Sequence, residues 1–178
     1  MTPNNKMKIG LKIYSNTVWM GGVNYVTNWI KTLHCLPEPE KQEVYLIYQN
    51  QHGSYDKEAV KIAQAHRHLV KEVRPLTDVP KLGLDFFYPV TNIFEAPFGA
   101  PWAGWIPDWQ CKYLPEMFDP FELSRRDYHY RLLAQHAPSL AVSSQMAYDD
   151  TQRLVGDTHV PMQKLHFPSV MNLPPPGR

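Results

Sequence analysis

Hydrophobic and polar residues follow a period of two in the first well-defined segment of the chain. From Met7 to Tyr14, Ile9, Leu11 and Ile13 alternate with residues of other types, and this alternation predicts a β-strand. Short apolar runs farther along predict more strands. These runs occupy residues 43–48, 68–73, 84–90, 104–108, 139–144 and 162–168.

A period of about 3.6 residues marks the helices between these runs. From Val23 to Leu36, apolar residues form one helical stripe and polar residues form another. Residues 54–66 predict a short second helix, with Ser54 and Asp56 as capping residues.

The second half of the chain carries clearer helix boundaries. Asp119 is an acidic N-cap, Pro120 suits the first turn and Glu122 stands three residues after the cap, so a helix is expected from there to about His136. Another helix is expected from about residue 145, with Gly156 ending it.

Strands that alternate with amphipathic helices predict an α/β fold. Such a chain pairs its strands in parallel and forms an open, mostly parallel sheet with helices on both faces. Ligands of such sheets bind at the carboxyl ends of the strands, where the strand order reverses. The loops to inspect therefore follow Tyr14, Val90, Ile106 and Val142.

Composition narrows the functional classes. The chain has 178 residues, 43% hydrophobic residues and a net charge of +1, which gives no electrostatic case for nucleic acid or an anionic membrane. No apolar run reaches the roughly 20 residues that a transmembrane segment needs. The first residues lack the apolar core of a signal peptide, and Cys35 and Cys111 are interpreted as two buried free thiols. We therefore expect a cytoplasmic protein.

Gly21 and Gly22 form the first candidate site. If they precede a helix, their N–H groups would face an anion such as a pyrophosphate, whereas the alternative is a tight turn that needs positive φ. The G-x-G-x-x-G and G-K-S/T motifs of dinucleotide and P-loop sites are absent. This absence argues against an NAD-dependent oxidoreductase.

Asp108 is the second candidate, because it follows a predicted strand at the favoured edge of the sheet. It would either accept a hydrogen bond from a sugar hydroxyl, act as a general base or charge stabiliser, or merely cap a turn. Nearby aromatic residues would either form a platform for a sugar face or pack in the core. They are Trp102, Trp105, Trp109 and Tyr113.

Basic side chains offer weaker candidates. His66 and His68 form an H-x-H pair without an acidic or cysteine partner at ligand spacing, so we interpret them as a solvated helix end rather than a metal site. Three arginines on one predicted helix would either hold phosphates or pair with Glu122 and Asp127. They are Arg125, Arg126 and Arg131.

Several motifs, in order, resemble the N-terminal half of a GT-B glycosyltransferase of family four. They are W-x-G-G-x-x-Y-x-x-N-x-I from Trp19, WIPDWQ…YLPEMF from Trp105, RRDYHYRLLAQHAPSLAVSSQMAYDD from Arg125 and the final KLHFPSV. The resemblance extends from about Lys8 to Val170. It implies a single Rossmann-like domain over residues 1–170, the acceptor-binding half of a retaining, nucleotide-sugar-dependent transferase.

The resemblance also implies roles for individual residues. Gly21 and Gly22 would meet the phosphates of the donor, Asp108 would be catalytic, and Ser143 and Ser144 would lie at the interdomain face. No tightly bound cofactor and no metal are expected; the substrates would be a nucleotide sugar and a carbohydrate or lipid-linked acceptor. The acceptor-binding residues would be Asn16, Trp19, Asn24, Trp109 and Tyr113.

The chain departs from the family pattern at two places. Pro107 stands where many relatives have histidine, and Cys111 stands where a subgroup with I-P-D has another histidine. The donor-binding domain and its E-x7-E motif are missing, and residues 171–178 are interpreted as a remnant of the interdomain linker. The alternative is a non-enzymatic, single-domain Rossmann-like module that binds a sugar or a protein partner.

Overall fold

The computed structural model describes residues 6–14, 16–51, 54–55 and 57–169, without the side chains of 16–19, 50, 51, 54, 55 and 58. Seven strands form one sheet in the order β5-β2-β1-β6-β7-β8-β9, and every neighbouring pair is parallel. The strands are β1 (Lys8–Ile13), β2 (Glu43–Tyr48), β5 (Glu72–Pro75), β6 (Phe86–Val90), β7 (Trp102–Ile106), β8 (Leu140–Val142) and β9 (Met162–Lys164).

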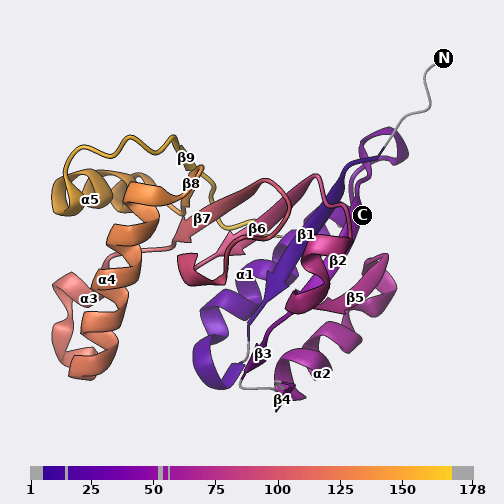
Figure 1. Cartoon of the computed structure of the whole chain (residues 1–178), viewed down its shortest axis with the longest axis horizontal. Coiled ribbons are helices and arrows are strands. Elements are labelled where there is room, and N and C mark those ends of the chain that lie inside the picture. Colours follow the sequence, from indigo (N-terminus) through magenta and orange to yellow (C-terminus); the bar gives the residue numbers. More distant parts are fainter. Residues whose placement is uncertain (1–5, 15, 52–53, 56, 170–178) are drawn as a thin grey trace, which may run out of the picture.

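Helices cover both faces of this sheet (Figure 1). The α-helices are α1 (Asn16–His34), α2 (Lys57–Ala65), α3 (Gln110–Tyr113), α4 (Pro120–His136) and α5 (Gln145–Val155). Short 3-10 helices are η1 (Glu38–Glu40), η2 (Arg67–Leu69), η3 (Leu76–Lys81), η4 (Ile93–Glu95) and η5 (Pro115–Met117). A separate antiparallel pair joins β3 (Asn50–Gln51) to β4 (Ser54–Tyr55). The predicted α/β fold, a single Rossmann-like unit, is confirmed.

The winding of the chain reverses between β1 and β6. From β1 the sheet grows through β2 to β5 on one side, and from β6 it grows through β7 and β8 to β9 on the other. Strand β1 pairs with β6 so closely that a Cβ on Gly10 would lie 2.5 Å from Leu84 Cδ1 and 2.9 Å from Phe87 Cδ2. A larger residue at this position would therefore force these two side chains to shift.

Side chains of the sheet are buried on both faces, as a parallel sheet requires. On one face, Leu11, Ile13 and Trp105 pack with residues of α1 and α2. On the other face, Leu133 of α4 and Ala147 of α5 pack over β7 and β8. Next to them a third cluster joins β2 and β6 to η3 and the segment before β7; it contains Tyr45, Ile47, Val79, Leu84, Phe87, Val90 and Phe98.

Helix α1 differs most from its prediction, because it begins at Asn16 rather than Val23. Gly21 and Gly22 therefore lie inside the helix instead of in a turn before it. A glycine in a helix costs about 1 kcal/mol relative to alanine, but the buried face that follows, with Tyr25 and Val26 fully covered, outweighs this cost. Tertiary packing has overridden local propensity.

Smaller differences concern short segments and one thiol. The strand expected over residues 68–73 is displaced toward the C-terminus, because η2 occupies its first residues. Ser54, expected as a helix cap, lies in β4, and Asp56 lies outside the described residues. Cys35 is exposed just beyond α1, whereas Cys111 is buried as expected.

One charged pair is buried at the carboxyl end of β1. The ammonium of Lys12, whose side chain is 1% exposed, forms an ion pair with Glu95 of η4, whose side chain is 11% exposed. Gln49 Nε2 donates a second hydrogen bond to the Glu95 carboxylate at 2.9 Å. Burial lowers the pKa of Lys12, although Glu95 opposes this shift. The pair ties η4 to the centre of the sheet.

Removal of one partner of this pair should destabilise the protein strongly. Lys12→Met leaves the Glu95 carboxylate buried without its cation, so we expect a loss of about 3–5 kcal/mol in the free energy of unfolding. The double variant Lys12→Met/Glu95→Met removes both charges and should be more stable than Lys12→Met alone. Urea unfolding followed by circular dichroism measures both values. A double variant that is no more stable than Lys12→Met would contradict a coupled pair.

Candidate functional site

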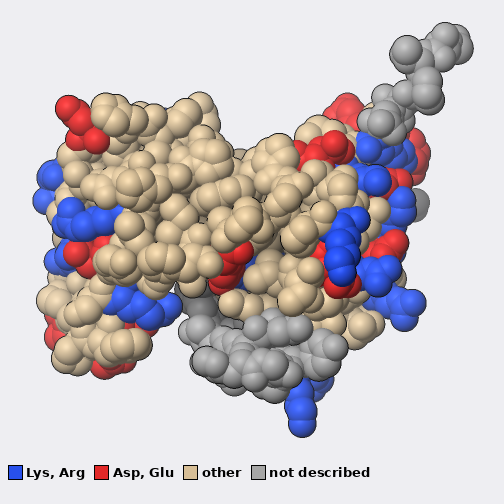
Figure 2. All heavy atoms as spheres, in the orientation of Figure 1, with Lys and Arg blue, Asp and Glu red and all other residues tan. Residues whose placement is uncertain are grey.

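The carboxyl ends of the strands form the edge at which a ligand site is expected. Loops that follow β1, β6, β7 and β8 meet there, and the reversal of strand order lies between β1 and β6. At this edge α3 and the first turns of α4 form a lobe that projects below the sheet (Figure 1). Figure 2 shows the surface of the molecule in the same orientation, with basic side chains in blue and acidic side chains in red.

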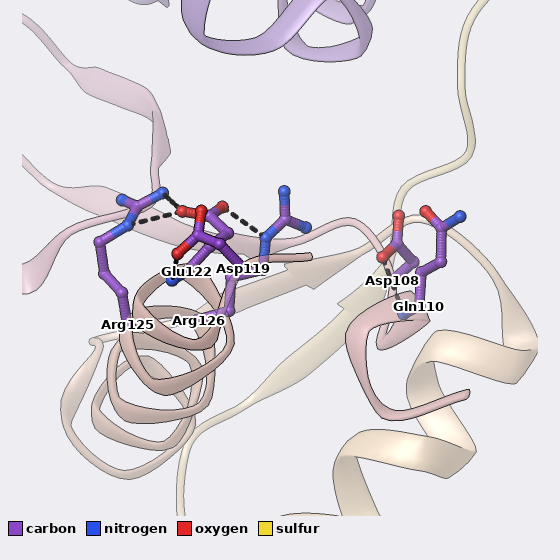
Figure 3. A network of polar contacts seen from close by, with 6 residues as sticks. All are labelled: Asp108, Gln110, Asp119, Glu122, Arg125 and Arg126. Carbon is purple, nitrogen blue, oxygen red and sulfur yellow. Dashed lines mark hydrogen bonds and ion pairs between the residues drawn. The ribbon is translucent and has the colours of Figure 1, made fainter. Parts of the chain in front are cut away.

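Asp108 stands at this edge, in the loop between β7 and α3. Its Oδ1 accepts a hydrogen bond from the backbone N–H of Gln110 at 3.0 Å, so one oxygen caps the start of α3. The carboxylate and the side chain of Gln110 extend side by side from the chain (Figure 3). Asp108 therefore has the turn-capping role, in which its Oδ1 accepts the hydrogen bond from Gln110. An acceptor and an amide next to one another are suited to sugar hydroxyls.

Glu122 organises the first turns of α4. One carboxylate oxygen accepts two hydrogen bonds from Arg125, at 3.0 and 2.6 Å, and the other accepts one from Arg126 Nε at 2.7 Å (Figure 3). Asp119 caps the helix by accepting from the N–H of Glu122 at 2.9 Å. The predicted helix start and the predicted pairing within the helix are both confirmed, and Arg131 pairs with Asp127 in the same way.

Arg126 lies within electrostatic range of Asp108. Its guanidinium lies over the ring of Phe118, 4.7 Å from the centroid. Burial opposes its charge, but Tyr130, Glu122 and Asp108 together raise its pKa. The same Asp108 carboxylate contributes to the raised pKa of Tyr130, for which burial is the main cause. Asp108 thus acts electrostatically on two residues of α4.

Trp109 does not belong to a surface platform. It is 1% exposed, its indole N–H donates to Thr151 Oγ1 at 2.9 Å and its ring packs edge-on against Tyr130. Trp105 is also buried, stacked on Tyr25 at 4.0 Å. The packing of α4 and α5 over β7 covers the ring, so the acceptor-binding role of Trp109 stays a prediction for which this structure offers no exposed face.

Tyr113 is half exposed, but its hydroxyl is already engaged. It donates to Asp150 of α5 and accepts a hydrogen bond from Arg153 Nη2 at 2.7 Å. This cluster fastens α3 to α5. The hydroxyl is not an open hydrogen-bonding group of the kind expected at an acceptor site.

The two serines after β8 also serve the fold. Ser143 is buried and its Oγ accepts a hydrogen bond from the indole N–H of Trp105 at 3.0 Å. Ser144 is the N-cap of α5 and accepts from the N–H of Ala147 at 3.0 Å. The Ser143 hydroxyl is therefore hydrogen-bonded inside the domain and does not point out at an interdomain face.

The donor-phosphate role predicted for Gly21 and Gly22 loses its physical basis. Beyond the first turn of a helix, backbone N–H groups donate to carbonyls four residues earlier, so those of this pair are used within α1. Gly21 is exposed and Gly22 is buried. Asn24 is exposed on the same helix, whereas the side chains of Asn16 and Trp19 lie outside the described part of the chain.

The remaining candidates take ordinary structural places. His66 follows α2 and its Nδ1 lies 2.9 Å from the carbonyl of Ile62, while His68 is exposed in η2. Burial raises the pKa of the Cys111 thiol, so this residue is a small apolar core residue and not a nucleophile. Within the described residues, no three histidine, cysteine, aspartate or glutamate side chains gather as metal ligands would.

Sequence reasoning missed the buried pair of Lys12 and Glu95, although a signal was available. A central strand of a parallel sheet is buried on both faces, so Lys12 in β1 had to be covered and needed an anionic partner. The partner was not predictable, because Glu95 lies in a loop-like segment 83 residues away.

Comparison with models of known protein families gives no match for this chain, and comparison with curated proteins gives none of significance. In the described part of the chain, no helix combines the length and the apolar character that a membrane crossing requires.

Glu122 should make the stability of the protein depend on pH. Burial alone would raise its pKa, but the hydrogen bonds from Arg126 and Arg125 outweigh burial and lower the pKa below its ordinary value of 4.5. The contribution of Glu122 to the free energy of unfolding is therefore complete above about pH 4.5. It is lost as the pH falls through the lowered pKa of the folded state.

The variant Glu122→Gln tests this assignment. At pH 7 it should be less stable than the wild-type protein by about 1 kcal/mol, as expected for partly exposed pairs. At pH 3 the difference should shrink, because this pH lies below the ordinary pKa of 4.5 and protonation of the carboxyl then favours the unfolded chain. Urea midpoints at the two pH values give the comparison, and a difference that is equal at both would argue against the ion pairs.

Proposed function

We propose that this chain is the acceptor-binding half of a retaining, nucleotide-sugar-dependent glycosyltransferase. The observation that carries the proposal is the strand order, which brings the WIPD loop with Asp108 to the carboxyl edge beside the reversal between β1 and β6. The ordered motifs that resemble GT-B enzymes of family four support the same assignment. The proposal assigns the donor-binding half to a second domain outside these residues.

The chemistry that this edge offers suits a neutral acceptor. Asp108 and Gln110 present a carboxylate and an amide, which accept from and donate to hydroxyl groups. The guanidinium groups of Arg125 and Arg126 are both paired with Glu122, whose carboxylate balances one of their two positive charges. In the intact enzyme, these residues would bind and orient the acceptor while the donor domain holds the nucleotide sugar.

A titration followed by NMR tests the proposal on the 178-residue chain. Methyl glycosides of glucose, galactose, mannose and N-acetylglucosamine are added to the isotope-labelled protein, followed in a separate series by UDP-glucose and GDP-mannose. At least one glycoside should shift the amide resonances of Asp108 and Gln110. The nucleotide sugars should show no micromolar affinity, because donor recognition is assigned elsewhere. Micromolar binding of either nucleotide sugar, or unmoved carboxyl-edge resonances with every glycoside, would count against the proposal.

Asp108→Asn should weaken glycoside binding without unfolding the domain. The amide oxygen can still accept from the N–H of Gln110, but the charge-assisted hydrogen bond to a sugar hydroxyl is lost, so the Kd should rise about tenfold. Asp119→Asn is the matched control, because asparagine caps a helix as well as aspartate does and Asp119 takes no part in the proposed contact. Equal affinities of the two variants would return Asp108 to a turn-capping role alone.

A further inference from the structure

Two aromatic side chains stand exposed together beside this edge. Phe94 of η4 and Tyr128 of α4 are 63% and 55% exposed, their ring centroids are 6.1 Å apart and their planes differ by 23°. The ring of His129 lies behind them, edge-on to Phe94 at 5.9 Å and to Tyr128 at 5.7 Å. We call the Phe94 and Tyr128 rings the aromatic pair.

The turn that carries Phe94 is held on both sides. Asn92 caps η4, its side chain accepting from the N–H of Phe94 at 3.0 Å. The next residue, Glu95, is anchored in the interior by Lys12 and by Gln49. Because its neighbours are fixed in this way, the outward position of Phe94 is imposed by the buried ion pair and not by a loose loop.

The size of the aromatic pair limits what can cover it. Aromatic side chains present about 150–250 Å² each, so the exposed fractions leave about 250 Å² open on the two rings. A stable protein interface needs about 800 Å² from each partner. The two rings by themselves are therefore smaller than one side of such an interface, and their area matches a ligand of one ring.

Charge and polarity around the pair select the type of ring. Arg125, one turn before Tyr128 on α4, is held by two hydrogen bonds to the Glu122 carboxylate, so its guanidinium is directed at that group. Burial, and then the nearby Arg125, lower the pKa of His129, which keeps its ring neutral at pH 7 although Glu95 opposes the shift. The flat apolar faces have the Tyr128 hydroxyl and the Arg125–Glu122 pair at their margin. An uncharged ring with one apolar face and hydroxyl groups at its edge fits this arrangement.

We propose that Phe94 and Tyr128 form a stacking subsite for one neutral sugar ring of the acceptor, held in position by the buried Lys12–Glu95 pair. This proposal rests on the proposed function and deepens it, because it assigns a second contact on the acceptor besides Asp108. The C–H face of a pyranose would lie on the rings. Apolar surface of the sugar and of the protein would then be removed from water.

Saturation-transfer NMR with the same four methyl glycosides tests the subsite. The glycoside that binds the wild-type protein should lose affinity about five- to tenfold in Phe94→Ala and in Tyr128→Ala, in line with the energy of an aromatic contact. Phe94→Trp keeps an aromatic face and should retain binding. Because both side chains are largely exposed, these variants are expected to fold, and circular dichroism checks this.

Two matched variants serve as controls. Phe121→Ala removes a ring that is 76% exposed and lies about 10 Å farther along α4, beyond the reach of a monosaccharide on the aromatic pair. Met146→Ala removes an apolar side chain of similar exposure from α5. Neither change should alter the affinity.

The outcomes separate this proposal from the proposed function. Glycoside binding that still shifts Asp108 and is unchanged in Phe94→Ala would overturn the subsite and leave the proposed function standing. Absence of glycoside binding by the wild-type protein would overturn both. Stronger saturation transfer to uridine or adenosine than to every glycoside would overturn the sugar assignment, and self-association abolished by Phe94→Ala would show that a second copy of the chain covers the rings.

Discussion

The pairing of β1 with β6 is the constraint on which the rest of the molecule depends. It joins two strands that are far apart in the sequence and places the reversal of winding at the centre of the sheet. Gly10 leaves room beside this pairing for the side chains of Leu84 and Phe87, which would have to shift for a larger residue. Everything proposed for function lies at the carboxyl edge that this pairing creates.

The same reversal explains the buried charge. A lysine in a central strand has no route to solvent across a covered sheet, so it is retained only with a partner and at the cost of desolvation. Here the partner is Glu95 of η4, which follows β6 at the carboxyl edge of the sheet. The pair of Lys12 and Glu95 therefore fixes the position of η4 after β6, and with it the outward position of Phe94.

Much of the fold was predictable because it rests on local patterns. The alternation in β1, the capping residues of α4 and Gly156 at the end of α5 all act within a few residues, and each prediction is confirmed. The start of α1 was not predictable in this way. Its glycines favour a turn locally, whereas the burial of Tyr25 and Val26 against distant strands favours a helix, and only the assembled sheet contains that information.

The candidate site was less predictable than the fold for the same reason. Whether an aromatic side chain packs in the core or binds a ligand depends on which helix covers it. Trp109 and Tyr113 are covered by α5, which supplies their partners Thr151 and Asp150. The local sequence around the two aromatic residues does not indicate this contact. The position of Asp108 after a predicted strand was sufficient to place it at the carboxyl edge of the sheet, where the structure has it. The exposed position of Phe94 depends on η4 being held by Lys12 of β1 and by Gln49 after β2, which are distant from it in the sequence. Contacts of that kind shape any ligand site at the edge of a parallel sheet, since each loop at this edge follows a different strand.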